Sequence, residues 1–240
     1  MRGWWWARQD SSGRWPQAWS LWWLADAALH VGRLEDSLRW SKRAEDIAIA
    51  TFSKTVEVHA LTLRGDALRL LGDRERALPI YELGLGELAD HGDFWCRSLR
   101  GEELASMLVE SDRPSAIELL EESAAIAHRL DITFVILRCA TDVARLATHD
   151  GEFLVALELF APYDVWTRAH VDRIESKAEF RLEVLESTRE PEYSLAMESV
   201  EPQVRDEAWA RGAEMSVDDV YAKIMAWLAR ERSVISTRVS

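Results

Sequence analysis

The stretch Leu61–Tyr81, which reads LTLRGDALRLLGDRERALPIY, decides the fold. Apolar residues recur at helical spacing on both sides of Gly72, which predicts two amphipathic helices joined by a short turn. A glycine just past a helix readily takes the left-handed backbone that ends many helices. Gly65 and Ala77 supply the small side chains that two helices need where they cross closely. The stretch therefore predicts an antiparallel helical hairpin.

The same pattern occurs four times along the chain. The turn positions are Gly32, Gly72, Asp112 and Gly151, at spacings of 40, 40 and 39 residues. Small residues keep this spacing before the turn, at Ala25, Gly65, Ala105 and Ala144, and after it, at Ser37, Ala77, Ala116 and Ala156. A fixed period of this length indicates stacked repeats. We expect helix pairs at about 17–50, 55–90, 94–130 and 132–166, the third being the least regular because Asp112-Arg113-Pro114 replaces the glycine turn.

The composition argues against a nucleic-acid-binding, membrane-spanning or disulfide-bonded protein. The 240 residues include 42 Asp and Glu against 29 Lys and Arg, a formal net charge of -13. This charge would repel free nucleic acid, so we expect no direct nucleic-acid contact. No stretch approaches the roughly 18 apolar residues of a membrane-spanning helix, and the start lacks a signal peptide. Cys96 and Cys139 are expected to be core thiols in a reducing compartment. These features predict a cytoplasmic protein with no membrane contact. The length allows one domain or two, and the repeated pattern favours one.

The repeat resembles the tetratricopeptide repeat, whose small residues fall at these places and whose larger apolar positions match Leu21, Leu61 and Leu68. The usual period of that family is about 34 residues. A period near 40 is similar to the long-helix variant in the sensor regions of bacterial regulators like the maltose activator. The resemblance implies a right-handed α-solenoid of helical hairpins that binds partners instead of catalysing a reaction.

The closing stretch 207–220 resembles the last segment of actinobacterial signal-transduction ATPases and large LuxR-type regulators. In those proteins a helix ending in Ala-Trp-x-x-Gly precedes a Ser and an acidic last helix, here with Trp209, Gly212 and Ser216. We expect Gly212 to stop one helix and Ser216 with Asp219 to form a capping box for the next. Trp209 and Trp227 should pack this hairpin onto the preceding repeats. The chain carries neither the P-loop nor the DNA-binding motif of those regulators, so the resemblance implies neither activity and is that of an isolated sensor region.

These observations predict an all-α fold, a right-handed α-solenoid of tetratricopeptide-like helical hairpins with a period of about 40 residues. The predicted segments are a Trp-rich N-terminal segment at 1–16, four helix pairs at 17–170, C-terminal capping helices at 171–230 and a tail at 231–240.

Motifs for catalysis, metal binding and cofactors are absent from the sequence. The metalloprotease pattern His-Glu-x-x-His and the hydrolase pattern Gly-x-Ser-x-Gly do not occur. Gly84 and Gly86 lack the third glycine of a dinucleotide site, and indicate close approach of two helices instead. Adjacent acidic pairs, such as Glu102-Glu103, are expected on solvated helix surfaces. We therefore expect a protein that is not an enzyme and holds no cofactor or metal.

In tetratricopeptide repeats the first helix of each pair lines the concave surface. Residues one turn from the small position are then expected in a binding groove: Trp22, Asp26, Thr62, Asp66, Arg69, Glu102, Ser106, Thr141, Arg145 and Thr148. Their mixed charges and hydroxyl groups suit a peptide or a small polar effector. Solvation of an exposed helix face is the simpler explanation for any one of them.

Tryptophan is concentrated at the N-terminus, where seven of the 12 tryptophans fall within the first 23 residues. Some of them are expected to cover the open end of the solenoid. Trp4, Trp5 and Trp6 are alternatively interface residues, since aromatic side chains often anchor partners. Two functions follow. The first is a sensor or scaffold module of a bacterial transcriptional regulator or signalling ATPase, which binds a protein segment or small effector. The alternative is a structural solenoid that dimerises or assembles domains through its Trp-rich end.

Overall fold

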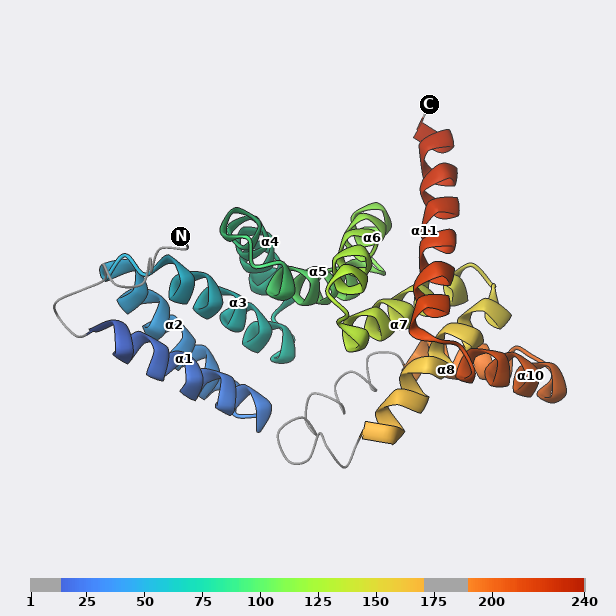
Figure 1. Cartoon of the computed structure of the whole chain (residues 1–240), viewed down its shortest axis with the longest axis horizontal. Coiled ribbons are helices and arrows are strands. Elements are labelled where there is room, and N and C mark those ends of the chain that lie inside the picture. The colour runs from blue at the N-terminus through green and yellow to red at the C-terminus, as the bar shows by residue number, and fades with distance from the viewer. Residues whose placement is uncertain (1–13, 171–189, 240) are drawn as a thin grey trace. The chain divides into compact units, whose positions relative to one another are not determined.

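The computed structural model describes residues 14–170 and 190–239 (Figure 1). Its helices are α1 (Arg14–His30), α2 (Leu34–Ala50), α3 (Lys54–Leu70), α4 (Arg74–His91), α5 (Phe94–Leu108), α6 (Arg113–Arg129), α7 (Thr133–His149), α8 (Phe153–His170), α10 (Pro202–Ala213) and α11 (Val217–Val239). Residues 190–198 are also helical. The described residues contain no strand, so the prediction of an all-α fold is confirmed. None of the described helices has the length and apolar content that crossing a bilayer requires.

The described helices fall into two compact units. The first contains α1 to α4, and the second contains α5 to α8, the helical segment 190–198, α10 and α11. Within each unit the helices pack as antiparallel hairpins: α1 on α2 and α3 on α4 in the first, α5 on α6 and α7 on α8 in the second. The sequence predicts one domain, whereas the contacts define two bodies.

The small residues lie at the helix crossings. All eight predicted small positions are buried. A Cβ atom on Gly65 of α3 would lie 3.2 Å from Ile80 of α4, and one on Gly84 of α4 would lie 2.8 Å from Thr62 of α3. Larger side chains at these points would push the two helices apart. The two helices are therefore close because these positions are small, as the sequence predicts.

The turns inside the hairpins use left-handed backbone. Gly32, Gly72 and Gly151 have φ angles of 74°, 79° and 74°, as predicted for helix stops. Between hairpins the same conformation falls on Gly92 and, with more strain, on Phe52 and Asp131.

The irregular third turn has its own chemistry. Asp112 is the N-cap of α6, and its carboxylate accepts a hydrogen bond from the amide of Ser115. Pro114 occupies the first turn of the helix, where its missing amide hydrogen is not needed. Asp73 and Asp93 cap α4 and α5 in the same way. Each such cap stabilises its helix by about 0.5–2 kcal/mol.

The C-terminal helices cap the second unit. Helix α10 packs on α8, and α11 packs on α6 and α7. The Trp227 ring of α11 is buried, and its indole donates a hydrogen bond to Glu152 at 3.0 Å. Ser216 and Asp219 exchange the hydrogen bonds of a capping box, as predicted.

Two C-terminal expectations differ from the structure. Gly212 does not stop a helix, because α10 continues through Ala213. A Cβ at Gly212 would lie 2.3 Å from the backbone oxygen of Glu158, so this glycine lets α10 touch the α8 backbone. The stretch predicted as a tail, 231–240, is helical to Val239. Ion pairs of Glu231 with Arg113 and of Arg232 with Glu121 hold it against α6.

Candidate functional site

The predicted groove residues of the first unit form internal contacts. Trp22 donates its indole hydrogen to the backbone oxygen of His59 at 3.2 Å, and Thr62 donates to the same oxygen at 3.0 Å. Asp66 is fully buried and accepts a hydrogen bond from the Tyr81 hydroxyl, to which Arg69 also donates at 3.2 Å. The half-buried Asp26 lies 3.6 Å from His30 in the next turn of its own helix.

In the second unit, Glu102 belongs to a buried charged cluster between α5 and α7. Glu102 lies 2.6 Å from Arg138, and Glu103 lies 2.6 Å from Arg100 and 3.5 Å from Arg138. Both carboxyl groups come from residues that are 1% exposed, so the expectation of a solvated Glu102-Glu103 pair is wrong. The reason is that α7 covers this face of α5 and supplies Arg138.

Burial raises the pKa of Glu102 well above its usual range. The Arg138 charge opposes this rise, whereas the neighbouring charges of Asp142 and Glu103 increase it. A hydrogen bond joins Glu102 to Asp142, which a protonated Glu102 can donate. Burial likewise raises the pKa of the nearby Cys139 thiol, which keeps it protonated and unreactive. Cys139 is therefore the core thiol that the sequence predicts, whereas Cys96 is only partly buried.

Arg145 of α7 is the centre of a second buried contact set. Its guanidinium donates to Asp142 at 3.0 Å and to the Ser106 hydroxyl at 3.2 Å. Glu192, from the helical segment 190–198, lies 3.6 Å from Arg145 and 3.1 Å from His149. Successive first helices of this unit are thus joined by charged and polar side chains.

The remaining groove residues also form hydrogen bonds within the protein. Thr141 and Thr148 donate their hydroxyl hydrogens to backbone oxygens one turn earlier, those of Leu137 and Ala144. None of the ten predicted groove residues is exposed: Thr62, Asp66, Glu102, Arg145 and Thr148 are buried, and the others are half-buried. Their contacts stabilise the repeats, and a ligand-binding role for them stays a prediction. The predicted interface residues Trp4, Trp5 and Trp6 lie outside the described residues.

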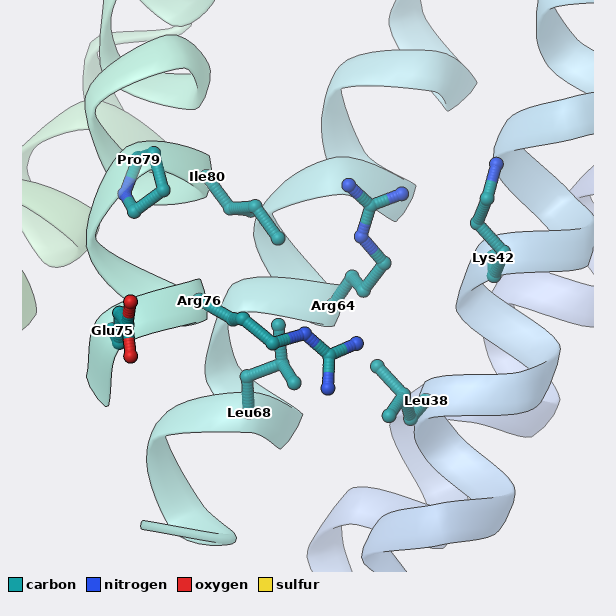
Figure 2. A pocket seen from close by; sticks show the side chains of 8 residues that line it. All are labelled: Leu38, Lys42, Arg64, Leu68, Glu75, Arg76, Pro79 and Ile80. Carbon is teal, nitrogen blue, oxygen red and sulfur yellow. The ribbon is translucent and has the colours of Figure 1, made fainter. Parts of the chain in front are cut away.

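A pocket of about 540 Å³ lies elsewhere in the first unit, between α2, α3 and α4 (Figure 2). Its volume falls in the usual range for ligand sites. It combines an apolar floor with charged groups from all three helices, and its lining residues are Leu38, Lys42, Arg64, Leu68, Glu75, Arg76, Pro79 and Ile80. Figure 2 shows the Arg76 side chain extending from α4 toward Leu38 of α2, across Leu68 of α3.

Three cations and one carboxylate line this pocket. Arg64 is held by Glu45, while Lys42 pairs with Asp46 at 2.5 Å and Arg76 with Asp73 at 3.0 Å. The two more exposed pairs, those of Lys42 and Arg76, contribute only about 0–1 kcal/mol each. Lys42 also lies 3.9 Å from Glu45, and both Lys42 and Arg76 have more donors than these contacts use. Both can therefore bind a further carboxylate at little energetic loss.

The sequence reasoning missed this pocket because it assigned binding to the first helices alone. Lys42 and Arg76 belong to second helices, and the periodic pattern does not separate them from other basic residues. One signal was present: Pro79 lies inside α4 and lacks the amide hydrogen that a helix interior uses. An interior proline at a solvent-facing position indicates a place where the helix surface is irregular.

Comparison with known proteins supports the repeat fold. No protein-family model matches the chain, and no curated protein matches it. Among solved structures, the crystal structure of nearly identical TPR-like repeats from a Podosopora anserina kinesin light chain is similar, with a TM-score of 0.54 and 18% sequence identity. The match covers 91% of this chain and 98% of that chain. At this identity the likeness concerns the fold alone, and it shows that this chain has the predicted all-α, tetratricopeptide-like solenoid fold.

Proposed function

We propose that this chain is a non-catalytic interaction module that binds a protein segment in the pocket between α2, α3 and α4. The observation that carries the proposal is the pocket itself, where Lys42, Arg64 and Arg76 surround an apolar floor in a strongly acidic chain. The tetratricopeptide-like fold supports it, because stacked helical hairpins create extended surfaces for partners.

The shape of the pocket favours a protein segment over a small effector. Its rim residues Lys42, Glu75, Arg76 and Pro79 are all exposed, so the pocket is open to solvent. Sites for small molecules usually bury about 70–90% of the ligand. An open pocket instead accepts one or two side chains from a surface that extends beyond it.

The lining defines the chemistry of the segment. Leu38, Leu68 and Ile80 suit an aliphatic side chain, while Lys42 and Arg76 suit a carboxylate beside it. A segment with Asp or Glu next to Leu, Ile or Val therefore complements the pocket. Glu75, at the rim, disfavours a second acidic residue on its side.

Selection of displayed random peptides on the full chain tests this proposal, followed by isothermal titration of the enriched peptides. We expect an acidic residue beside an aliphatic one in the enriched peptides, and about tenfold weaker binding to Arg76→Glu, which corresponds to about 1.4 kcal/mol. Arg39→Glu is the matched control: Arg39 is 66% exposed and pairs with Asp36, as Arg76 is 67% exposed and pairs with Asp73. Equal affinities for both variants would refute the pocket as the site.

The first-helix groove is the second candidate surface. It is favoured by the half-buried residues Trp22, Asp26, Arg69, Ser106 and Thr141, which keep part of their surface accessible. Asp26→Ala and Arg69→Ala are its proper tests. Substitution of the buried Asp66 or Arg145 would change stability before it changed binding.

We further propose that the module serves as the sensor or scaffold part of a bacterial transcriptional regulator or signalling ATPase. The closing stretch supports this, since the capping box of Ser216 and Asp219 lies in the segment that resembles those regulators. The neighbouring reading frames provide the check. A frame for a P-loop ATPase beside this one supports a regulator, and a locus without one supports a free-standing adaptor.

A further inference from the structure

Helix α1 has an exposed face without charged groups. This face consists of Pro16, Gln17, Ser20, Trp23, Leu24 and Ala27, with Val31 just after the helix, all of which are exposed. Trp23 is 60% exposed and Leu24 is 48% exposed, although both are large and apolar. The Ser20 hydroxyl donates to the backbone oxygen of Pro16, so it presents no unsatisfied donor to a partner. The Trp23 ring is held edge-on against Trp22, with ring centroids 4.6 Å apart.

The equivalent face of the next repeat, on α3, is buried against other helices. At an offset of 40 residues, Pro16, Ser20, Trp23 and Ala27 of α1 correspond to Val56, Ala60, Leu63 and Ala67 of α3. All four α3 residues are buried. They pack on the preceding hairpin: Val56 with Ala18 and Ala48, Ala60 with Leu21 and Ala44, and Leu63 with Leu29 and Leu34. In this fold the face is a packing surface.

One difference between the two helices indicates the chemistry of the occupant. Leu24 of α1 stands where α3 has Arg64, and Arg64 pairs with Glu45 of the preceding hairpin. The occupant of the α1 face therefore presents an apolar group at this point, where the preceding hairpin presents a carboxylate.

We propose that this face of α1 binds the same face of α1 in a second copy of the chain, with the two helices antiparallel. Residues 20, 23, 24 and 27 have the spacing of a four-residue hole that receives a side chain from a facing helix. Ser20 and Ala27 are small corners of this hole, and Trp23 of the second copy fills the space between them. The face is thus complementary to itself, as a two-fold dimer requires.

The net charge of the chain also favours the α1 face as the contact between two copies. Each copy carries a formal charge of -13, so two copies repel each other over most of their surface. Association is least opposed where the contact contains no charged side chain, and the α1 face meets this condition. The proposal is independent of the pocket, which is formed by α2, α3 and α4.

Sedimentation velocity of the full chain over a range of concentrations tests the dimer. We expect concentration-dependent dimers, and Trp23→Glu should raise the dissociation constant at least about 30-fold, the loss typical of an anchor aromatic. Leu83→Glu is the control, since Leu83 is a large apolar residue of α4 that is 56% exposed. Circular dichroism shows whether each variant is folded.

Disulfide trapping provides a second test that needs no disruptive change. Leu24→Cys in a Cys96→Ser background places a thiol beside the two-fold axis, while Cys139 stays buried. Packed helices about 8–10 Å apart bring facing Cα atoms within the roughly 4–7 Å that a disulfide spans. We expect a covalent dimer after oxidation, and none for Leu83→Cys.

Three results would overturn the proposal. The first is a wild-type chain that is monomeric at every concentration. The second is a dimer that Trp23→Glu leaves unchanged although the variant is folded. The third is a dimer that only replacement of Trp4, Trp5 and Trp6 by Ala abolishes, which assigns the contact to the N-terminal segment.

Discussion

Glu102 illustrates how a single buried acid makes stability depend on pH. Its pKa in the folded protein is raised well above the ordinary value of 4.5, chiefly by burial. The folded state therefore holds the proton more tightly than the unfolded chain does. It follows that the contribution of Glu102 to the free energy of unfolding is most favourable at low pH and falls as the pH rises from 4.5 through the folded pKa.

Replacement of Glu102 by Gln should remove the stability that Glu102 costs the folded protein as the pH rises. Glutamine keeps a hydrogen-bond donor for Asp142 and cannot ionise. We expect Glu102→Gln to gain stability relative to the wild type as the pH rises from about 5 to about 9, measured by urea unfolding at each pH. Glu118→Gln, at an exposed position of α6, is the control. A stability difference that does not change with pH would contradict the account.

Gly212 makes the sharpest steric prediction. An added methyl group meets backbone atoms of Glu158, which cannot rotate away, so Gly212→Ala should destabilise the protein by about 1–3 kcal/mol. Gly86 is the matched glycine, because a Cβ there has no atom within 4 Å. Gly86→Ala should stabilise α4 by about 0.5–1 kcal/mol. Thermal unfolding compares the two, and a harmless Gly212→Ala would show that α10 does not touch α8 this closely.

Single residues differ in how well the sequence predicts their surroundings. The small positions were predictable because a hairpin crossing imposes the same requirement in every repeat. The burial of Glu102 was not, because its partners Arg138 and Asp142 lie on α7, and the helical period does not say which polar face a later helix covers.

Among the elements, α11 forms polar contacts with two carboxylates of the last hairpin, Glu152 just before α8 and Glu158 within α8. Burial alone would raise the pKa of Glu158, but hydrogen bonds from Lys223 of α11 and Arg211 of α10 outweigh it and lower the pKa below 4.5. Burial would likewise raise the pKa of Glu152, but hydrogen bonds from Arg230 and Trp227 outweigh it and lower that pKa. Such pairs stabilise the folded state above pH 4.5, and this stabilisation is lost as the pH falls through the folded pKa.

Glu158→Gln should therefore weaken the attachment of the C-terminal helices at neutral pH and matter little in acid. We expect a loss of about 1 kcal/mol, because Lys223 and Arg211 are partly exposed and water screens them. Urea unfolding at about pH 7 and about pH 3 measures the difference, with Glu198→Gln at an exposed position as control. An equal loss at both pH values would argue that Glu158 acts through packing alone.

Element boundaries followed from local signals. Glycine turns and the Ser216–Asp219 box act within a few residues, so the sequence was enough to predict them, whereas the caps formed by Asp73, Asp93 and Asp112 were not predicted. The helix from 231 to 239 was missed because its support comes from Arg113 and Glu121 of α6, more than a hundred residues earlier.

At the scale of the whole molecule, the repeat predicted the class of fold but neither the two compact units nor the pocket. The pocket depends on which side chains of α2, α3 and α4 leave space between them, and this is a property of packing in three dimensions. The repeat explains why three helices meet there. It does not explain why Lys42 and Arg76 lie there, since the equivalent positions of the next repeat hold Glu82 and Ser115.

The proposed binding of a partner segment between α2, α3 and α4 makes these three helices the place where a bound peptide should slow amide exchange. Hydrogen exchange with mass spectrometry, on the full chain with and without a peptide selected on it, tests this most directly. The account predicts added protection at residues 38–42, 64–68 and 75–80, which contain the lining residues. Protection confined to α5 and α7, with none around the pocket, would contradict it.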